Sequence, residues 1–420
     1  MVNNRPDQTV ITQANRIALL LPSLEGGGAE RSMLNLAAGL VSRGRQVELI
    51  LCKGKGGLMD QVPEGVSVVI LDVTPGLAAR ALLALRHPLD ALAMLRPILL
   101  AKKNPPEVSR IPAIRRYLKQ QKPDALLSAL TYANLAALWA AGSNGRATPV
   151  IVSERIALWT SCHAPNNVRK WRWRYAPQLV RRIYPRASAV VTVSQHAADE
   201  LTDKIGLQHA RILPLNNPVV DDRLRRLAAE PLDHPWFADG NSPVILSAGR
   251  LTEQKDFRTL LSAFALVRAE RSARLVILGE GRLKNDLNQQ ANTLGIADDI
   301  DFPGFVDNPF NYMSRASVFV LPSLYEGLPG VLIQAMACGC PLVSTDSPGG
   351  SADILQQGKH GELVKVSDAE DMARGILAQL ENPTPKEQLL SRAEDFSVEG
   401  AVDKYLALLD LVASEATGQQ

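Results

Sequence analysis

"VILSAGRLTEQKDFRTLLSAFALVRAERSARLVILGEG", residues 244–281, is the stretch that decides the fold. It begins with an apolar run at 244–251 and ends with another at 273–281, and each has the length and composition of a buried strand. Between them, residues 255–270 carry apolar side chains at helical spacing. Strands that are apolar on both faces and alternate with helices predict a parallel sheet with helices covering it.

The same alternation fills most of the chain. Further strands of this kind are expected at 16–24, 46–52, 66–72, 124–130, 149–155, 187–194, 299–305, 316–323 and 341–346. A polar, proline-rich stretch at 213–243 interrupts the pattern and has the character of a linker. The sequence therefore predicts an α/β protein, and ligands of such sheets bind at the carboxyl ends of the strands.

The interruption sets the expected domain boundaries. A length of 420 residues suits two domains of about 200 residues each. We expect a Rossmann-like, doubly wound domain over 1–215, a linker over 216–242 and a second such domain over 243–395, with the two domains facing each other across a cleft. Residues 396–420 are expected to form a helix that packs back on the first domain.

Composition and charge limit the location and the partners. The four cysteines are scattered, which argues against a disulfide framework, and no apolar run reaches the roughly 18 residues needed to cross a bilayer, so a cytoplasmic protein is expected. Lys and Arg exceed Asp and Glu by 12 over residues 1–240, whereas the acids are in excess by 9 over residues 241–420. The basic first half indicates an anionic partner, such as a phospholipid surface, a diphosphate or a nucleic acid, or else unevenly spread solubility charge.

Three glycines, Gly26 to Gly28, lie between the first expected strand and the first expected helix. A dinucleotide site of the G-x-G-x-x-G type would need Gly or Ala at position 31, which is Arg31, and an acid at the end of the second strand, which ends in Lys53. An NAD site is therefore disfavoured. Glycines before a helix N-terminus still expose backbone N–H groups to an anion, and a flexible turn is the alternative interpretation.

Two cations lie at or just after the end of the strand expected at 244–251. Arg250 lies at its end and Lys255 five residues later, at the edge of the sheet where ligands bind. Such a pair can neutralise both phosphates of a diphosphate and the charge of a leaving group, although two solvated charges would look the same in the sequence. Gly279 and Gly281 of "GEG", after the next strand, are a weaker signal, because a turn alone would explain them.

The stretch "SLYEGLPG", residues 323–330, predicts a turn into a helix. Amides at the start of that helix would point at a phosphate, with the helix dipole assisting. Glu326 beside them can accept hydrogen bonds from sugar hydroxyls, and Gln334, about two turns into the helix, can reach a second set of hydroxyls. The expected ligand is therefore a diphosphate that joins two polyols.

A basic and aromatic stretch, "NVRKWRWRYAPQLVRRIYPR" at 167–186, holds seven Lys or Arg, two Trp, two Tyr and no acid. This composition suits the interface of an anionic bilayer, and residues 77–103 upstream also mix apolar and basic side chains. Single-stranded nucleic acid could use the same chemistry but would leave the second half unexplained. A solvated helix that packs its Trp residues inward is the alternative. The expected membrane contacts are Arg169, Lys170, Trp171, Arg172, Trp173 and Arg174.

Together these motifs resemble the family-4 retaining glycosyltransferases of the GT-B fold, the glycosyltransferase group 1 type. The resemblance covers nearly the whole chain, and the motifs of the second half, in this order, are highly specific. It rests on "GGGAER", "VTVS", "GRLTEQKD", "GEG", "FPGFVDN" and "LPSLYEGLPGVLIQAMACGCPLVSTDSPGG".

The resemblance implies a transfer of a hexose or N-acetylhexosamine from a nucleotide sugar, UDP-sugar in our prediction, to a lipid-linked or cell-envelope glycan. It implies no metal, no cofactor beyond the nucleotide sugar and no nucleic acid, with the protein peripheral at the inner face of the plasma membrane. Arg250, Lys255 and Glu326 are the expected catalytic residues. The expected donor-binding residues are Gly27, Gly28, Gly279, Gly281, Phe305, Val306, Gly327, Leu328, Pro329, Gly330, Val331 and Gln334.

The chain departs from the family pattern at two places. The family has Glu, seven residues and Glu, whereas here Gln334 stands at the second position, so ribose would meet a neutral amide. The family often has a histidine in the first domain, where this chain has Glu154 and Arg155; with Thr131 they are the expected acceptor side. Two other hypotheses stay open: a UDP-sugar epimerase of the same fold, which needs no glycan acceptor, and a non-catalytic subunit that binds sugar nucleotides.

Overall fold

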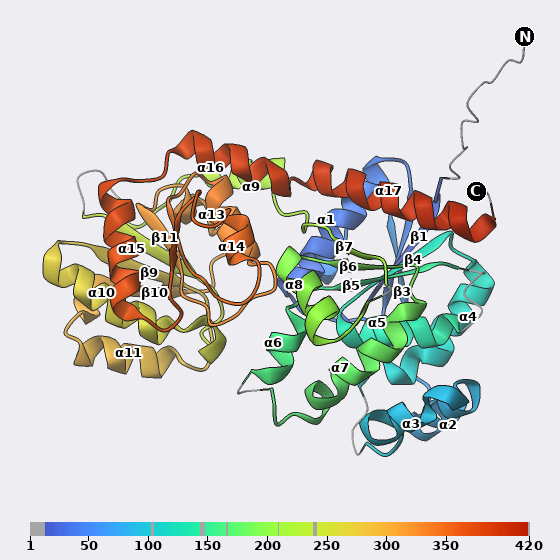
Figure 1. Cartoon of the computed structure of the whole chain (residues 1–420). Helices are drawn as coiled ribbons and strands as arrows, with labels where there is room; N and C mark the ends of the chain where they lie inside the picture. The colour runs from blue at the N-terminus through green and yellow to red at the C-terminus, as the bar shows by residue number, and fades with distance from the viewer. Residues whose placement is uncertain are drawn as a thin grey trace, which may run out of the picture. The chain divides into compact units, whose positions relative to one another are not determined.

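The computed structural model of the chain describes residues 13–101, 105–142, 148–164, 167–208, 210–237 and 242–418. These residues form two compact units of α/β structure (Figure 1). Unit 1 comprises Met1–Val193, Ala197–Pro218 and Ala401–Gln420, and unit 2 comprises Ser194–His196 and Val219–Gly400.

Unit 1 is built on a parallel sheet of seven strands in the order β3-β2-β1-β4-β5-β6-β7. The strands are β1 (Arg16–Leu21), β2 (Gln46–Leu51), β3 (Val66–Ile70), β4 (Ala125–Ala129), β5 (Val150–Glu154), β6 (Ala189–Thr192) and β7 (Ile212–Pro214). The longer helices of the unit are α1 (Gly28–Ser42), α2 (Gly76–Arg86), α4 (Ile111–Gln121), α5 (Thr131–Ala141), α7 (Trp171–Ile183) and α17 (Val398–Thr417). Every residue of β4 and β5 is buried, which explains why their sequences do not alternate between apolar and polar.

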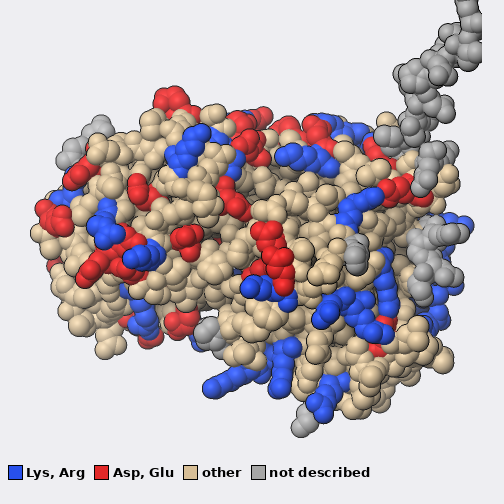
Figure 2. All heavy atoms as spheres, viewed as in Figure 1, with Lys and Arg blue, Asp and Glu red and all other residues tan. Residues whose placement is uncertain are grey.

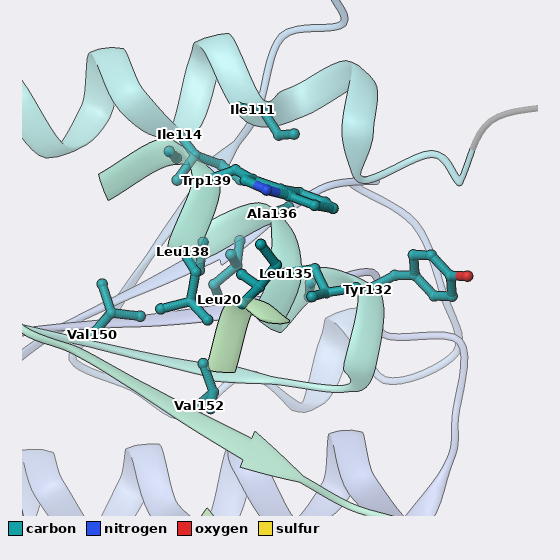
Figure 3. Packing of buried hydrophobic residues seen from close by; sticks show 14 of the residues in the cluster. Leu20, Ile111, Ile114, Tyr132, Leu135, Ala136, Leu138, Trp139, Val150 and Val152 are labelled. Carbon is teal, nitrogen blue, oxygen red and sulfur yellow. The ribbon is translucent and has the colours of Figure 1, made fainter. Parts of the chain in front are cut away.

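Helix α5 lies at the centre of the unit 1 core. All its residues except Ala141 are buried, so it has no solvent face. Figure 3 shows the Trp139 ring of this helix packed beside Ile111 and Ile114 of α4, while Leu138 lies toward Val150 of β5. The core therefore holds α5 and β5 in place, and both elements carry candidate site residues.

Unit 2 has a parallel sheet of six strands in the order β10-β9-β8-β11-β12-β13. The strands are β8 (Val244–Ala248), β9 (Arg274–Leu278), β10 (Ile300–Gly304), β11 (Val318–Leu321), β12 (Leu342–Thr345) and β13 (Glu362–Val364). Its longer helices are α9 (Asp222–Ala229), α10 (Phe257–Glu270), α11 (Lys284–Thr293), α13 (Gly330–Ala337), α15 (Ala369–Glu381) and α16 (Lys386–Ala393). The predicted α/β class and every predicted strand are confirmed; β7 and β13 were not predicted, and α9 lies within the segment expected to be a linker.

The last helix, α17, packs on unit 1 along much of its length. Asp410 accepts hydrogen bonds from the backbone N–H of Ala14 at 2.7 Å and from the Arg45 guanidinium at 3.1 Å. Glu415 binds Arg211 at 2.8 Å, and Arg43 pairs with Asp403. The helix is thus joined to unit 1 by several charged contacts at separate points.

Two loops cross with their backbones in contact at the carboxyl edge of the unit 2 sheet. The N–H of Leu251, after β8, donates to the carbonyl of Glu280, after β9, at 2.8 Å. Gly279 has φ +124°, and a Cβ there would lie 2.1 Å from the carbonyl oxygen of Gly249. A Cβ at Gly281 would lie 2.4 Å from the carbonyl oxygen of Leu251. The glycines of "GEG" therefore allow the two loops to approach this closely.

Replacing Gly279 by Ala tests this crossing. The new methyl group would meet a backbone oxygen in a conformation that L residues rarely adopt, so Gly279→Ala should lower the free energy of unfolding by about 3 kcal/mol. The matched control is Gly295→Ala, because Gly295 also has a positive φ, +69°, but nothing within 4 Å of the added Cβ. It should cost about 1 kcal/mol. Equal losses in the two variants, measured by denaturant unfolding, would contradict the close approach.

Candidate functional site

An ion pair between Lys255 and Glu326 marks the carboxyl edge of the unit 2 sheet. Lys255 Nζ donates to Glu326 Oε1 at 2.5 Å, and Ser323 Oγ donates to the same oxygen at 2.7 Å. The side chains are only 15% and 11% exposed, so the pair is largely shielded from water. Lys255 follows β8 and Glu326 follows β11, two strands that are neighbours in the sheet. The structure therefore brings together two residues that lie 71 positions apart.

Hydrogen bonds to backbone groups hold the loops that carry this pair. Gln254 donates from its side chain to the carbonyl of Tyr325 at 2.9 Å, and the N–H of Leu324 donates to the carbonyl of Gln254 at 2.8 Å. The N–H of Glu326 donates to the carbonyl of Pro348 at 2.9 Å, and a Cβ at Gly349 would lie 2.2 Å from the Glu326 carbonyl oxygen. The loops after β8, β11 and β12 thus meet at Glu326, and their positions fix its carboxylate.

The other predicted donor residues of unit 2 lie on loops at the same edge or in helix α13, which begins there. Helix α13 begins at Gly330, and no side chain caps it at Pro329, so its first amides are open to an anion. Gln334 lies in this helix and is half-buried, whereas Phe305, after β10, is 73% exposed. Arg250 is exposed and makes no ion pair among the residues that the structure describes. Gly327 and Leu328 lie in the turn before α13, Val331 is the second residue of that helix, and Val306 follows Phe305.

Glu154 is the centre of a buried network in unit 1. It ends β5, is 0% exposed and accepts hydrogen bonds from Thr131 Oγ1 at 2.9 Å and from the Tyr184 hydroxyl at 2.7 Å. Asn134 donates to the same hydroxyl at 3.0 Å. Burial raises the pKa of Glu154 to about 7, and the hydrogen bonds from Tyr184 and Thr131 limit the rise. The carboxyl therefore positions the first turn of α5, which Thr131 begins.

Arg155 follows Glu154 and is also buried. Its guanidinium donates to Ser32 Oγ at 3.4 Å and to the Asn217 side chain. Because Ser32 lies in the second turn of α1, Arg155 joins the end of β5 to the helix that the three glycines precede. Gly28 begins α1 and Gly27 is its N-cap; a Cβ at Gly27 would lie 2.3 Å from Glu30 Oε2, so the Glu30 carboxylate lies over this turn.

The predicted membrane contacts lie at or just before the start of α7. Arg169, Lys170, Arg172 and Arg174 are exposed, and Trp171 is 45% exposed. Trp173 is half-buried and packs against the unit 1 core cluster. Of the two tryptophans, Trp171 therefore offers the freer surface. No helix within the described parts of the chain is long and apolar enough to cross a membrane.

Asp299 and Asp301, an Asp-x-Asp pair at the start of β10, both bind basic side chains. Asp299 binds Arg268 at 2.6 Å and also pairs with Arg274, and Asp301 contacts His234 Nε2 at 3.1 Å. The described residues contain no group of three or more His, Cys, Asp or Glu placed to hold one metal ion.

Sequence reasoning missed the residues that hold the candidate groups in place. Ser323 binds Glu326, and Tyr184 and Asn134 complete the network around Glu154. Ser323 could have been noticed, because it lies three residues before Glu326 in a turn. Tyr184 is 30 positions from Glu154, and no spacing rule connects the two.

Solved glycosyltransferase structures share this fold. A structure of Anabaena Alr3699/HepE in complex with UDP has a TM-score of 0.69 and 19% sequence identity, and the likeness covers 93% of this chain and 98% of that one. The lipopolysaccharide outer core galactosyltransferase WaaB has a TM-score of 0.68 and 17% identity over the same shares of the two chains. The two parallel sheets and this likeness define the GT-B fold.

Family matches cover both units. Residues 27–218 match the glycosyl transferase 4-like domain, and residues 230–396 match the glycosyl transferases group 1 family. The chain belongs to this family of retaining enzymes, known as GT4, which confirms the resemblance read from the sequence.

Curated relatives bear names of the same class. A Campylobacter jejuni enzyme, N-acetylgalactosamine-N,N'-diacetylbacillosaminyl-diphospho-undecaprenol 4-alpha-N-acetylgalactosaminyltransferase, is 28% identical over 51% of this chain and 57% of its own length. The lipopolysaccharide core biosynthesis glycosyltransferase LpsE of Rhizobium meliloti is 33% identical over 40% of this chain and 50% of its own. The chain thus spans about half the length of these relatives. A second Campylobacter jejuni enzyme, an alpha-1,4-N-acetyl-D-galactosaminyltransferase, is 25% identical over 94% of this chain and 98% of its own.

The buried network around Glu154 predicts a pH-dependent stability. The folded pKa, about 7, lies above the ordinary value of 4.5, so folding favours the protonated carboxyl. The unfavourable contribution is therefore absent below about pH 4.5 and complete above pH 7. Between pH 5 and pH 8, the free energy of unfolding of the wild type should fall by about 2 to 3 kcal/mol relative to Glu154→Gln, which cannot ionise. Denaturant unfolding at both pH values measures this, and a difference that does not change with pH would contradict the assignment.

Proposed function

We propose that the chain transfers a hexose or N-acetylhexosamine, with retention of configuration, from a UDP-sugar to a hydroxyl of a lipid-linked or cell-envelope glycan. The observation that carries the proposal is the Lys255–Glu326 pair at the carboxyl edge of the unit 2 sheet, beside the uncapped start of α13. The UDP bound in Alr3699/HepE and the undecaprenol named for the Campylobacter jejuni relative support this choice of donor and acceptor. Such an acceptor implies a protein that is peripheral at the inner face of the plasma membrane.

The diphosphate would lie between the cations and the start of α13. Arg250 is exposed and free to turn toward a ligand, and Lys255 is already fixed by its ion pair. A diphosphate would compete with Glu326 for the Lys255 ammonium, which has three N–H donors and can serve both anions. The first amides of α13 add a partial positive charge.

The sugar and the nucleoside would occupy the two sides of the diphosphate. Glu326 keeps one carboxylate oxygen for which no partner is described, Oε2, and this oxygen can accept hydrogen bonds from the hydroxyls of the donor sugar. Gln334, further along α13, is the candidate for the ribose, where its amide both donates and accepts. The exposed ring of Phe305 and the neighbouring Val306 are the candidates for the base.

The bond that forms, the bond that breaks and the proton that moves in the transfer can all be accounted for. The acceptor oxygen forms a bond to the anomeric carbon while the bond from that carbon to the diphosphate oxygen breaks. The acceptor's proton passes to the departing diphosphate on the same face, and Arg250, Lys255 and the α13 amides stabilise the negative charge that develops there. In unit 1, Glu154 and Arg155 act as positioning residues because both are buried; Gly27 and Gly28 offer exposed backbone at the start of α1.

A donor screen tests the proposal. Thermal stabilisation should be greatest with UDP and UDP-sugars, and smaller with GDP-sugars and ADP-sugars. UDP release should then require both a UDP-sugar and an extract that contains lipid-linked glycan. Release without any acceptor would favour the epimerase hypothesis. No stabilisation by any of the three nucleotide classes would contradict the donor site.

Replacing Lys255 tests the role of the ion pair in turnover. Lys255→Ala should lower kcat/KM about a hundredfold, which corresponds to about 3 kcal/mol of lost transition-state stabilisation, because one charge-assisted contact to the leaving group is lost. The matched control is Arg258→Ala, which removes an exposed cation of the neighbouring helix α10 that pairs with Asp286 at 2.9 Å. The control should keep turnover within about twofold. Wild-type turnover in Lys255→Ala would contradict the assignment.

A further inference from the structure

Exposed leucines are concentrated in one segment of unit 1. We call residues 73–100 the leucine segment; it contains α2, α3 (Ala91–Met94) and the irregular helical turns around them. Its most exposed large apolar side chains are Leu77 at 81%, Leu85 at 78%, Leu89 at 84%, Leu92 at 85% and Leu100 at 68%. Among the large apolar side chains that the structure describes elsewhere, only Phe305, at 73%, reaches this range. So many exposed leucines in one place mark an interaction surface.

The opposite side of the leucine segment is firmly joined to unit 1. Leu83, Met94 and Ile98 belong to the core cluster. Asp90, 1% exposed, accepts hydrogen bonds from Arg182 at 2.9 Å and Arg186 at 2.6 Å, both near the end of α7.

The Arg80 guanidinium of the segment donates to the carbonyls of Leu99 at 3.0 Å and of Ala101, just after the segment, at 2.7 Å. His87 Nε2 lies 3.0 Å from the carbonyl of Trp139 in α5. These polar contacts hold the segment together and attach it to the core. The segment is therefore firmly packed on unit 1, and the fold itself holds these leucines on the surface.

Cations surround the leucines. Arg86 and Arg96 of the segment are exposed, and its one acid, Asp90, is buried and already paired. Trp171, at the start of α7, donates from its indole N–H to the carbonyl of Pro97 at 3.4 Å. This contact places the exposed cations at the start of α7 beside the leucine segment. Figure 2 shows Lys and Arg gathered on the lower part of unit 1, where α7 and the segment lie, with few Asp or Glu among them.

We propose that the leucine segment inserts into the surface of an anionic phospholipid bilayer, with the cations at the start of α7 on the headgroups. Leucines on a fixed helical element can enter the boundary between headgroups and acyl chains, and neighbouring Arg and Lys attract anionic lipid. The inference refines the proposed function, because a lipid-linked acceptor would lie in that bilayer. Two copies of the chain pairing through this face would bring their cations together, so the charge favours an anionic partner.

In this proposal the apolar contact with the bilayer comes mainly from the leucine segment, whereas the sequence prediction assigned the membrane contacts to residues 169–174. Arg172 lies over the rings of Tyr132 and Trp173, 5.1 and 5.8 Å from their centroids. Since Trp173 packs against the core, α7 supplies charge and the Trp171 ring, whereas the leucine segment supplies the apolar surface. Lys102 and Lys103, which end the upstream stretch singled out in the sequence, lie outside the described residues.

Co-sedimentation with vesicles tests the leucines directly. The variant replaces Leu85, Leu89 and Leu92 by Ser, and the matched control replaces Leu266, Leu294 and Leu390, which are 41%, 38% and 37% exposed in unit 2, by Ser. The wild type and the control should bind vesicles of phosphatidylcholine and phosphatidylglycerol equally, and the variant at least about tenfold more weakly. Raising the salt to about 0.5 M should weaken but not abolish wild-type binding, because only the charged part is screened. Equal binding of variant and wild type would overturn the proposal, as would a loss of self-association in the variant with unchanged vesicle binding.

A second measurement decides the case if the triple variant fails to fold. The described cysteines, Cys52, Cys162, Cys338 and Cys340, are all buried, so Leu92→Cys adds one accessible thiol for an environment-sensitive fluorophore. Its emission should shift to shorter wavelength with anionic vesicles, whereas the same label at Leu294→Cys should not change. No shift at position 92 would overturn the proposal. UDP binding is measured on the same samples, and a loss of vesicle binding with unchanged UDP binding separates this surface from the donor site.

Discussion

The Lys255–Glu326 ion pair is the interaction on which the candidate donor site depends. It joins the loops after two adjacent central strands, and it can do so only because the backbones of the neighbouring loops pass in direct contact. Glycine is required at Gly279 and Gly349 for that reason: a side chain at either position would strike a carbonyl oxygen. The "GEG" and "PGG" motifs therefore set the distance between a cation and a carboxylate.

The two candidate carboxylates have opposite environments, and this difference is the reason for proposing different roles for them. Glu326 accepts from an ammonium and a hydroxyl and is partly exposed, so its carboxylate can contact a ligand. Glu154 has no exposure and accepts hydrogen bonds from neutral groups, the hydroxyls of Thr131 and Tyr184 and the backbone of Arg155, and burial raises its pKa to about 7. A buried carboxyl such as Glu154 holds the neighbouring elements in place through its hydrogen bonds. This is the physical basis for treating Glu326 as a contact residue and Glu154 as a positioning residue.

Much of the fold could be predicted from the sequence, because buried parallel strands are continuous apolar runs. β7 and β13 were missed because each has only three residues, too few for a pattern. Strand ends also placed Arg250, Lys255 and Glu326 at one edge. Their pairing could not be predicted, because it depends on which strands are neighbours. The leucine segment is apolar on both sides, so its periodicity does not show which leucines are buried and which are exposed.

The affinity of Glu326→Gln for UDP, measured by calorimetry, tests the central claim most directly. If Lys255 is shared between Glu326 and the donor diphosphate, removing the carboxylate charge frees the ammonium and removes a repulsion. UDP should then bind about fivefold more tightly than to the wild type, a gain of about 1 kcal/mol, while sugar transfer falls because the sugar loses its carboxylate contact. A UDP affinity that drops tenfold or more in Glu326→Gln would contradict the account, since it would mean that the carboxylate, and not the cation beside it, holds the nucleotide.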